Sequence, residues 1–345
     1  MQEKDITLVN NLIKNAENPI LICDDDVDGV TSGVLIKSVY PKSKIYVSKV
    51  EGPKIKLSAL DRILDYLPDL IVILDKPLVE QDFIDQAKIP IIWLDHHPVQ
   101  NQKRVHYFNS RNFNSEEVLP TSGIVGLLLK REDWLVLLGC VGDWYIPKFY
   151  KKLQKEYPDL LPKDPKDPGD IFFKSKFGDV IKRVFFSLRG KPQHAYKIAN
   201  ILDKIKDPYE ILDPKTEEGK YIFKKVDSMT KEYNKILNDA KKEATKDEFF
   251  LFSYKSATSY TTILANELIY TYPDKVVIVA RVDNNGLAKM GIRSPKYKIP
   301  KASDLVAKEF GGYSGGHDHA AGGVVKEEYL QDFFKRLKEE LKKQH

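Results

Sequence analysis

The stretch ICDDDVDGVTSG, Ile22 to Gly33, places four aspartates within five residues, directly after an apolar run. These aspartates are Asp24, Asp25, Asp26 and Asp28. Their carboxylates repel one another, so the cluster favours folding only when a cation neutralises it. The stretch is therefore either a metal site or a solvated turn. The apolar run before it predicts a buried strand, and the residues after it predict a helix.

One alternative for this motif is a calcium-binding EF-hand loop. The spacing Asp24-x-Asp26-x-Asp28-Gly29 matches the opening of such a loop. The twelfth position of the loop should be Glu, but here it is Leu35. The element before the motif is also predicted to be a strand and not a helix, so we exclude an EF-hand.

Short apolar runs alternate with helical segments in the first hundred residues. The runs are Pro19–Asp24, Lys44–Ser48, Leu70–Asp75 and Ile89–His97. Strands that alternate with helices imply parallel βαβ units. Such sheets bind ligands at the carboxyl ends of their strands. Asp24, Asp75 and Asp95 all lie at such ends, which predicts that they share one edge of the sheet.

The second half of the chain predicts a long helix and then another α/β unit. Apolar residues recur at helical spacing from Tyr221 to Ala240. A strand at 248–254, a helix at 261–272 and a strand at 275–282 are expected to follow.

The composition indicates a globular protein of two domains. The chain has 345 residues, enough for two domains, and no apolar run approaches the ~20 residues of a membrane helix. The N-terminus has no signal-peptide layout. Cys23 and Cys140 both lie in apolar runs, so we expect neither a disulfide framework nor a zinc site. We therefore expect a cytoplasmic protein that does not enter a membrane.

Acids and histidines gather at the predicted strand ends across the first half. They are Asp24, Asp26, Asp28, Asp75, Asp95, His96, His97 and Asp143. Carboxylates with one or two imidazoles can hold two divalent ions when one carboxylate bridges them. Oxygen and nitrogen ligands without sulfur suit manganese or magnesium.

A basic segment between Lys174 and Lys206 carries nine Lys or Arg and two acids, with aromatic residues between them. Such a stripe could follow a phosphate backbone and stack on bases. It could equally be a helical surface with buried aromatics and solvated lysines. The sequence leaves both interpretations open.

The motifs together resemble a known family. Asp24–Ser32, DDDVDGVTS, resembles the first motif of DHH phosphoesterases in the form seen in RecJ-type nucleases. Asp75, Asp95-His96-His97 and Gly142-Asp143 resemble the next three motifs. The segment Gly315-Gly316-His317, followed by Ala320-Ala321-Gly322-Gly323, resembles the Gly-rich loop of a DHHA1 domain. The compact layout is most similar to archaeal RecJ-like proteins.

The resemblance implies an α/β fold with two domains. An N-terminal DHH domain, residues 1–212, would hold a mainly parallel sheet flanked by helices. A connecting helix, residues 213–245, would lead to a smaller C-terminal α/β DHHA1 domain, residues 246–345. The active site would lie in the cleft between the domains.

The resemblance also implies roles for individual residues. Asp75 would bridge two manganese ions, with magnesium as the alternative metal. Asp26, together with Asp24, would hold one ion, and Asp28, His96 and Asp143 would hold the other. His97 would be a catalytic residue beside the substrate. The expected substrate-binding residues are Arg293, Ser294, Gly315, Gly316 and His317.

Three further positions are less determined by the resemblance. Arg281 is a weaker candidate for substrate binding. Lys76 could hold a substrate phosphate or point away from it. The segment Ser187–Gly190 could add a phosphate contact.

The implied function is that of a single-strand-specific RecJ-like exonuclease, which hydrolyses DNA or RNA to mononucleotides by a two-metal mechanism. Its partners would be single-stranded nucleic acid or short oligonucleotides, with replication and DNA-repair proteins in addition. One alternative is a phosphodiesterase for oligoribonucleotides or cyclic dinucleotides. Another is a replisome scaffold related to Cdc45. Scaffold relatives usually lose metal ligands, whereas every expected ligand is present here.

Overall fold

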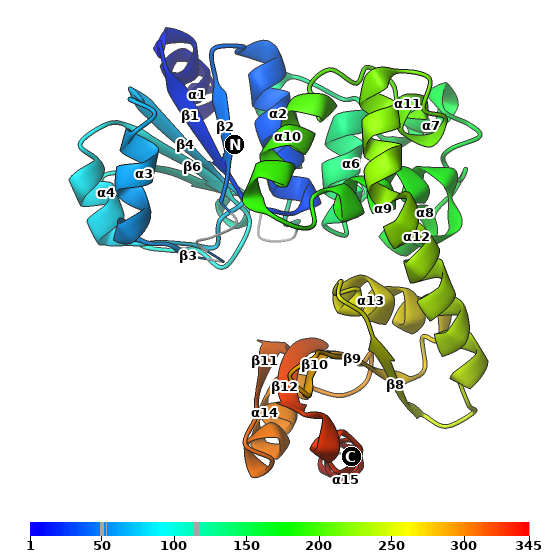
Figure 1. Ribbon diagram of the computed structural model, residues 1–345. Helices are drawn as coiled ribbons and strands as arrows, with labels where there is room; N and C mark the ends of the chain where they lie inside the picture. Colours follow the sequence, from blue (N-terminus) through cyan, green and yellow to red (C-terminus); the bar gives the residue numbers. More distant parts are fainter. Residues whose placement is uncertain (49–51, 53, 114–116, 345) are drawn as a thin grey trace. The chain divides into compact units, whose positions relative to one another are not determined.

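The computed structural model describes residues 1–48, 52, 54–113 and 117–344 (Figure 1). The chain divides into two compact units, Met1–Asp227 and Ser228–His345, and the division falls within helix α12 (Glu217–Glu243). Each unit has its own sheet.

The first unit is built on a parallel sheet of five strands in the order β2-β1-β4-β6-β7. The strands are β1 (Pro19–Cys23), β2 (Lys44–Val47), β4 (Leu70–Leu74), β6 (Ile91–Asp95) and β7 (His106–Asn109). Every residue of β1, β4 and β6 is buried, because helices cover both faces of the sheet. The order of strands reverses between β1 and β4, and this is where open α/β sheets bind ligands.

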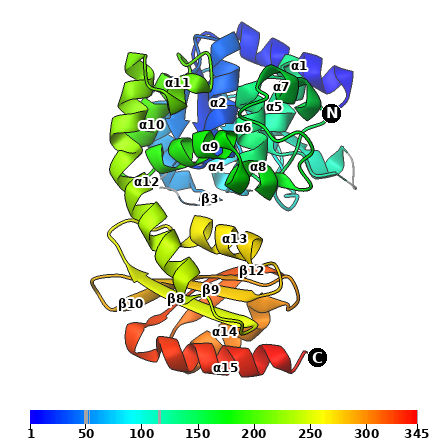
Figure 2. The same ribbon diagram turned by 90° about the vertical axis from the view of Figure 1, so that its right-hand side faces the viewer.

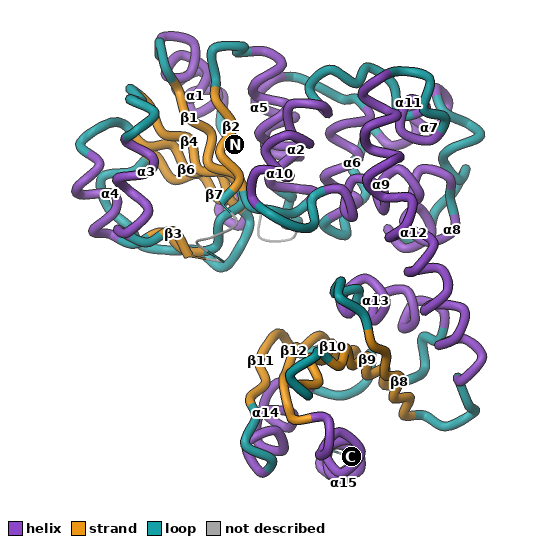
Figure 3. Tube along the Cα trace, in the orientation of Figure 1, coloured by secondary structure: helices purple, strands orange, loops and turns teal. Residues whose placement is uncertain are grey.

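Helices α3 (Leu60–Leu64) and α4 (Gln81–Ala87) cover one face of this sheet and share a core with Ile22, Ile73 and Trp93. Helices α2 (Val27–Val39), α5 (Thr121–Leu129) and α6 (Trp134–Gly142) pack together on the opposite face (Figures 1 and 3). The remaining elements are α1 (Glu3–Asn15), α7 (Tyr150–Glu156), α8 (Pro168–Lys174), α9 (Lys176–Ser187), α10 (Pro192–Leu202), α11 (Tyr209–Leu212) and a short pair, β3 (Lys54–Ile55) with β5 (Leu78–Val79).

The second unit contains a mixed sheet in the order β11-β12-β10-β9-β8. Its strands are β8 (Phe249–Lys255), β9 (Val276–Val282), β10 (Leu287–Arg293), β11 (Tyr313–His317) and β12 (Ala320–Lys326). Strands β8 and β9 are parallel and the other pairs are antiparallel. Helix α13 (Thr261–Thr271) covers one face, and α14 (Ile299–Glu309) and α15 (Leu330–Lys342) cover the other (Figure 2).

The predicted fold class is confirmed: a parallel sheet flanked by helices comes first, and a separate α/β unit follows. One strand escaped prediction. Strand β7 lies at the sheet edge, and only Phe108 of its four residues is apolar, or two residues with Tyr107 counted by its ring, so no apolar run marks it. The prediction of a Gly-rich loop is wrong, because Gly315 and Gly316 lie inside β11 and pair with β12. Within the described ranges, no helix is both long and apolar enough to cross a membrane.

Candidate metal centre

The acidic motif begins where β1 ends. Asp24 follows the strand, and the next aspartates start helix α2, where Asp26 Oδ1 accepts the Gly29 N–H at 2.9 Å. A Cβ on Gly29 would lie 2.8 Å from the Asp24 backbone nitrogen, so only glycine lets the helix start this close to the strand end. Asp28 lies in the first turn and is 1% exposed.

The second strand end supplies Asp75. Because β1 and β4 are parallel neighbours with Cys23 opposite Leu74, Asp24 and Asp75 emerge side by side at the switch point. Asp75 is 1% exposed and has a φ of 63°, a left-handed conformation that few non-glycine residues adopt, although aspartate adopts it more readily than most. Such strain in a buried residue indicates a functional constraint at this position.

Three overlapping groups of ligand-type side chains form at this edge, and in each group the ligand atoms lie within 4.8 Å of one another. The groups are Asp24-Asp26-Asp75, Asp28-His96-Asp143 and Asp75-His96-His97. His96 Nε2 lies 3.1 Å from Asp75 Oδ1 and 3.3 Å from Asp143 Oδ2. Asp75 and His96 are therefore each shared by two groups.

The charges of this cluster fit a cationic ligand. Desolvation of the Asp26 carboxylate by the surrounding protein atoms, together with repulsion from Asp24 and Asp28, raises its pKa to about 7, although the residue keeps accessible surface. Burial and the charge of Asp28 raise the pKa of Asp143 to about 8, and burial together with repulsion from Asp26 raises the pKa of Asp75 well above its usual value. The Asp26 side chain is exposed, so solvent screens part of its repulsion. Divalent cations would remove the repulsion altogether.

The imidazoles differ in their protonation. Burial lowers the pKa of His96, which favours the neutral ring that can bind a metal ion. His97 Nδ1 lies 2.7 Å from Asp95 Oδ1, and this contact outweighs burial and raises the pKa of His97. Asp95 is itself held, because its Oδ2 accepts hydrogen bonds from the Tyr107 hydroxyl and the Asn109 amide. Strand β7 thereby orients His97 through Asp95.

The N-terminus of helix α5 holds two of the carboxylates. The backbone N–H groups of Thr121 and Ser122 donate to Asp28 Oδ2 and Oδ1 at 2.7 and 2.9 Å. The Thr121 hydroxyl, fully buried, donates to Asp75 Oδ1 at 3.0 Å. The sequence did not identify Thr121, Tyr107 or Asn109 as parts of the site. The only indication of Thr121 in the sequence is a threonine at the predicted start of a helix, and this cannot be distinguished from an ordinary helix-capping residue.

Comparison with known proteins gives this arrangement a family. A model of the DHH family, N-terminal domain, matches residues 19–161, and a model of the DHHA1 domain matches residues 248–343. The chain belongs to the DHH/DHHA1 family. The DHH match contains every residue of the three ligand groups.

Individual relatives of this DHH/DHHA1 chain are distant. The uncharacterized protein MJ0831 of Methanocaldococcus jannaschii is 32% identical over 114 residues, which are 31% of this chain and 26% of that protein. The crystal structure of RecJ with Mn²⁺ from Thermus thermophilus has a TM-score of 0.67 and 14% identity, and the match covers 99% of this chain but only 54% of RecJ. A structure of exonuclease RecJ bound to manganese has a TM-score of 0.64 and 14% identity, covering 97% and 92% of the two chains.

Two proteins with other roles share the fold at a TM-score of 0.51. CDC45 from Entamoeba histolytica is 11% identical, and the match covers 98% of this chain and 99% of CDC45. The pGpG-specific phosphodiesterase PggH from Vibrio cholerae is 10% identical, with 94% and 99% covered. At such identities the likeness concerns the fold, and the DHH/DHHA1 fold does not by itself name a substrate.

The candidate substrate-binding residues of the DHHA1 region differ in their contacts and in their burial. The Arg293 Nε donates to Asn266 Oδ1 at 2.7 Å, and Nη1 donates to the backbone oxygen of Ile292 at 2.9 Å. Burial lowers the pKa of Arg293, so its guanidinium is desolvated and held by helix α13. Ser294 is buried, and its Oγ accepts the N–H groups of Lys296 and Tyr297. Ser294 thus forms a turn, which does not fit a direct substrate contact.

The glycines of β11 have different roles. A Cβ on Gly316 would lie 2.3 Å from the Ala320 oxygen, and its φ is 151°, so the hairpin requires glycine there. A Cβ on Gly315 would meet nothing within 4 Å, so this position is open. The side chain of His317 lies outside the described part of the structure. Arg281 donates from Nη1 to the backbone oxygen of Ser256 at 3.1 Å, and its buried Nε has no hydrogen-bond partner among the residues that the structure describes.

The basic segment is mostly a structural surface. Phe172, Phe177 and Phe186 are buried in the core, so their rings are not available to stack on bases. The Arg183 guanidinium donates to the backbone oxygens of Ile211 and Leu212 at the end of α11. These contacts support the interpretation of a helical surface with buried aromatics for this segment, which follows the residues matched by the DHH model.

Arg189, in the segment Ser187–Gly190, differs from its basic neighbours. Its guanidinium lies 4.1 Å from the centre of the Phe185 ring. Burial lowers its pKa, while the charges of Asp25 and Asp26 act in the opposite direction. Among the described residues, no side chain accepts a hydrogen bond from this guanidinium. Arg189 is therefore a half-buried cation on the side of the acidic motif.

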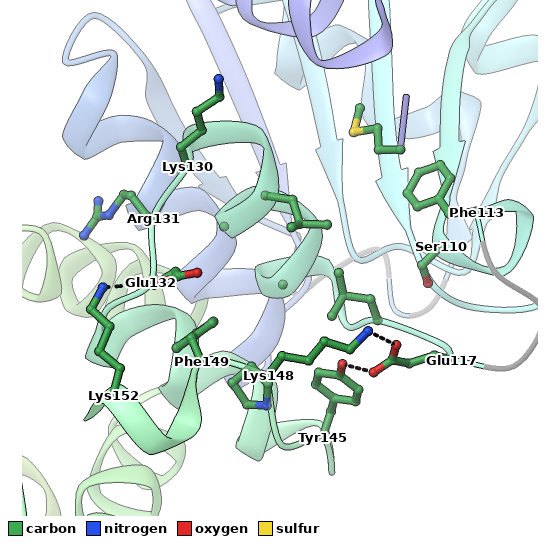
Figure 4. Close-up of a pocket in the computed structure, with 16 residues that line it drawn as sticks. Ser110, Phe113, Glu117, Lys130, Arg131, Glu132, Tyr145, Lys148, Phe149 and Lys152 are labelled. Atoms are coloured by element: carbon green, nitrogen blue, oxygen red, sulfur yellow. Dashed lines mark hydrogen bonds and ion pairs between the residues drawn. The ribbon is translucent and has the colours of Figure 1, made fainter. Parts of the chain in front are cut away.

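A pocket of about 700 Å³ also lies in the DHH region, beside α5 and the 145–152 segment (Figure 4). Its described lining contains none of the residues of the three ligand groups. Glu117 accepts from the Lys148 ammonium and the Tyr145 hydroxyl, and Glu132 pairs with Lys152 (Figure 4). Lys130 and Arg131, the other two basic side chains of the lining, pair with Glu3 and Asp133, which lie outside it. The described lining therefore presents ion pairs and no group of metal-ligand type.

Proposed function

We propose that this chain is a metal-dependent phosphodiesterase that removes mononucleotides from single-stranded nucleic acid. The observation that carries the proposal is the pair of ligand groups, Asp24-Asp26-Asp75 and Asp28-His96-Asp143, which are linked through the third group, Asp75-His96-His97. The matched RecJ structures hold Mn²⁺, which supports manganese as the metal. The RecJ structure with Mg²⁺ leaves magnesium as a second metal.

The donor set fits two divalent ions. The carboxylates of Asp75 and Asp143, both with raised pKa values, supply hard oxygen ligands, and His96 supplies a neutral nitrogen. Asp75 would bridge the ions, with Asp24 and Asp26 on one side and Asp28, His96 and Asp143 on the other. When bound, such a pair lowers the pKa of water and stabilises charge on a transferring phosphoryl group.

The residues of the chain would bind and orient the substrate. His97 is held at Nδ1 by Asp95, which leaves Nε2 to contact a phosphate oxygen or to hold a proton. Arg189 is oriented by Phe185 and offers guanidinium N–H groups to a phosphate. Arg293, held by Asn266, would bind a phosphate oxygen from the DHHA1 domain, and the open position at Gly315 would admit substrate close to the backbone. An active site in a cleft between the domains stays a prediction.

A short oligonucleotide is the second candidate substrate. The burial of Phe172, Phe177 and Phe186 reduces the stacking surface that favoured a long polymer, and leaves Tyr196 as the exposed aromatic residue of the segment. The fold shared with PggH, a pGpG-specific phosphodiesterase, is compatible with a small substrate. The scaffold alternative is disfavoured, because all the expected ligands are present and lie together.

The test is hydrolysis of end-labelled single-stranded DNA and RNA of several lengths, and of a dinucleotide, in the presence of Mn²⁺. A ladder that ends in mononucleotides supports the exonuclease, and cleavage of the dinucleotide alone supports the small-substrate enzyme. Asp75→Asn is the control for a contaminating nuclease. Full activity in excess chelator, or no hydrolysis of any substrate with Mn²⁺ bound, would overturn the proposal.

A further inference from the structure

Lys76 is a lysine with no exposed surface, directly after the strained Asp75 at the end of β4. Its ammonium donates to Asp24 Oδ1 at 2.7 Å, to the Ser48 backbone oxygen at 3.1 Å and to the Gly52 backbone oxygen at 2.6 Å. An ammonium has three hydrogens, so all of its donors are used within the chain. Lys76 therefore does not reach a substrate phosphate.

These contacts fix Lys76 in place. A buried ammonium is costly unless a counter-charge and hydrogen bonds compensate its lost hydration. Asp24 provides the charge and the two carbonyls provide the remaining acceptors. Through them Lys76 connects the ends of β1, β2 and β4, because Asp24 follows β1 and Ser48 follows β2.

The bond also restricts how Asp24 can act. Its Oδ1 accepts the Lys76 ammonium and, at 2.8 Å, the N–H of Asp25. Both acceptor directions of Oδ1 are thereby used, which leaves Oδ2 for an ion shared with Asp26 and Asp75. A free aspartate in this place could rotate or bind through both oxygens.

The same pair sets the charge of the centre. The three ligand groups contain five carboxylates, Asp24, Asp26, Asp28, Asp75 and Asp143. With the ammonium of Lys76 included, four negative charges remain, the number that two divalent ions neutralise.

We propose that Lys76 is a positioning residue of the metal centre, which holds Asp24 in a neutralised pair so that only Oδ2 faces the ion. The inference rests on the proposed two-metal function and deepens it. Lys76 acts through Asp24 alone and contacts neither metal nor substrate.

The experiment is calorimetric titration of metal-free protein with Mn²⁺, which does not depend on activity. Lys76→Met should weaken one of two bound ions by roughly tenfold or more, the effect expected when the partner of a metal ligand is lost. The dissociation constant of the other ion should change by less than about threefold. A lysine that was merely a counter-ion would give the opposite sign, because its removal makes the site more negative and tightens binding. Unchanged or tighter binding in Lys76→Met therefore overturns the inference.

A double variant covers the case in which Lys76→Met does not fold. Asp24→Asn together with Lys76→Met leaves no buried unpaired charge, so this protein should fold. If Lys76 acts through Asp24, the double variant should bind Mn²⁺ as well as Asp24→Asn alone, within about threefold. A further tenfold loss in the double variant contradicts this. If the wild-type protein itself fails to bind two Mn²⁺, the proposed metal centre is wrong, and that result is distinct from a failure of the Lys76 inference.

Discussion

The hydroxyl of Thr121 provides the sharpest single-atom test of the proposed metal centre. It is fully buried and donates to Asp75 Oδ1 at 3.0 Å, across 46 residues of sequence. Thr121→Val removes this hydroxyl and keeps the shape and branching of the side chain. The backbone N–H groups that bind Asp28 are untouched by the substitution. The change therefore isolates one hydrogen bond to the carboxylate that is proposed to bridge the ions.

The size of the expected effect follows from that bond. A hydrogen bond to a charged group contributes about 1.5–3 kcal/mol, which is roughly a 10- to 100-fold change in an equilibrium constant. Loss of a residue that orients a metal ligand has a cost of the same order, about 10–100-fold in metal affinity or activity. We expect Thr121→Val to weaken Mn²⁺ binding and to lower kcat/KM by factors in this range.

Matched variants provide the controls. Thr121→Ser keeps a hydroxyl on the same backbone, so it should stay within about threefold of wild type. Ser122→Ala removes the neighbouring hydroxyl, which donates to the Cys140 sulfur and, within the described part of the chain, to no carboxylate. It should have little effect on Mn²⁺ binding. Calorimetry with Mn²⁺ and steady-state kinetics on one labelled substrate would measure all three. Wild-type affinity in Thr121→Val, or an equal loss in Ser122→Ala, would refute the reasoning.

Three further outcomes follow from the site. Asp75→Asn should bind less Mn²⁺ and lose nearly all turnover. Its metal-free form should melt at a higher temperature than metal-free wild type, because one of the mutually repelling charges is gone. Metal analysis and a thermal melt would measure these changes. Metal-free wild-type protein should lose stability as the pH rises from about 4 to about 8. In the folded state the pKa of Asp26 is about 7 and that of Asp143 about 8, both above the usual 3.8. The folded state therefore binds protons that it must release over this range, which lowers its free energy of unfolding. Urea midpoints across this range should fall without metal and stay level in saturating Mn²⁺; a rise without metal would contradict the mutual repulsion. Arg293→Ala should keep both Mn²⁺ ions and lose roughly 10- to 100-fold in kcat/KM, chiefly through a higher KM. Steady-state kinetics and metal content by mass spectrometry would show this. A loss of metal would contradict the assignment of Arg293 to substrate binding.

Much of the first unit could be predicted from the sequence, because local rules govern it. Continuous apolar runs identified β1, β4 and β6, since strands covered on both faces must be apolar throughout. Parallel pairing then brings the carboxyl ends of these strands to one edge, so the proximity of Asp24 and Asp75 followed from the order of elements. The acidic motif was recognisable because like charges at such spacing need a cation.

Other features depended on contacts between distant segments. The sequence could not show that Thr121 would reach Asp75, because that bond depends on how helix α5 packs against the sheet. Nor could it show that Lys76 would turn inward to Asp24, since a lysine after a strand end is more often solvated. In the basic segment the alternation of lysines and aromatics suits a binding surface and a helix face equally well.

The outcome at these positions was decided by burial. Phe177 is fully buried in the core, and Arg183 donates to the end of a neighbouring helix, so neither is presented to a polymer. Gly315 and Gly316 became part of a strand because β12 pairs with them, although their sequence is equally suited to a loop. The sequence alone determines which residues can carry charge, bind metal or permit a close approach. The tertiary structure determines which partners they meet, because a hydrogen bond or ion pair between distant segments depends on the packing of whole elements.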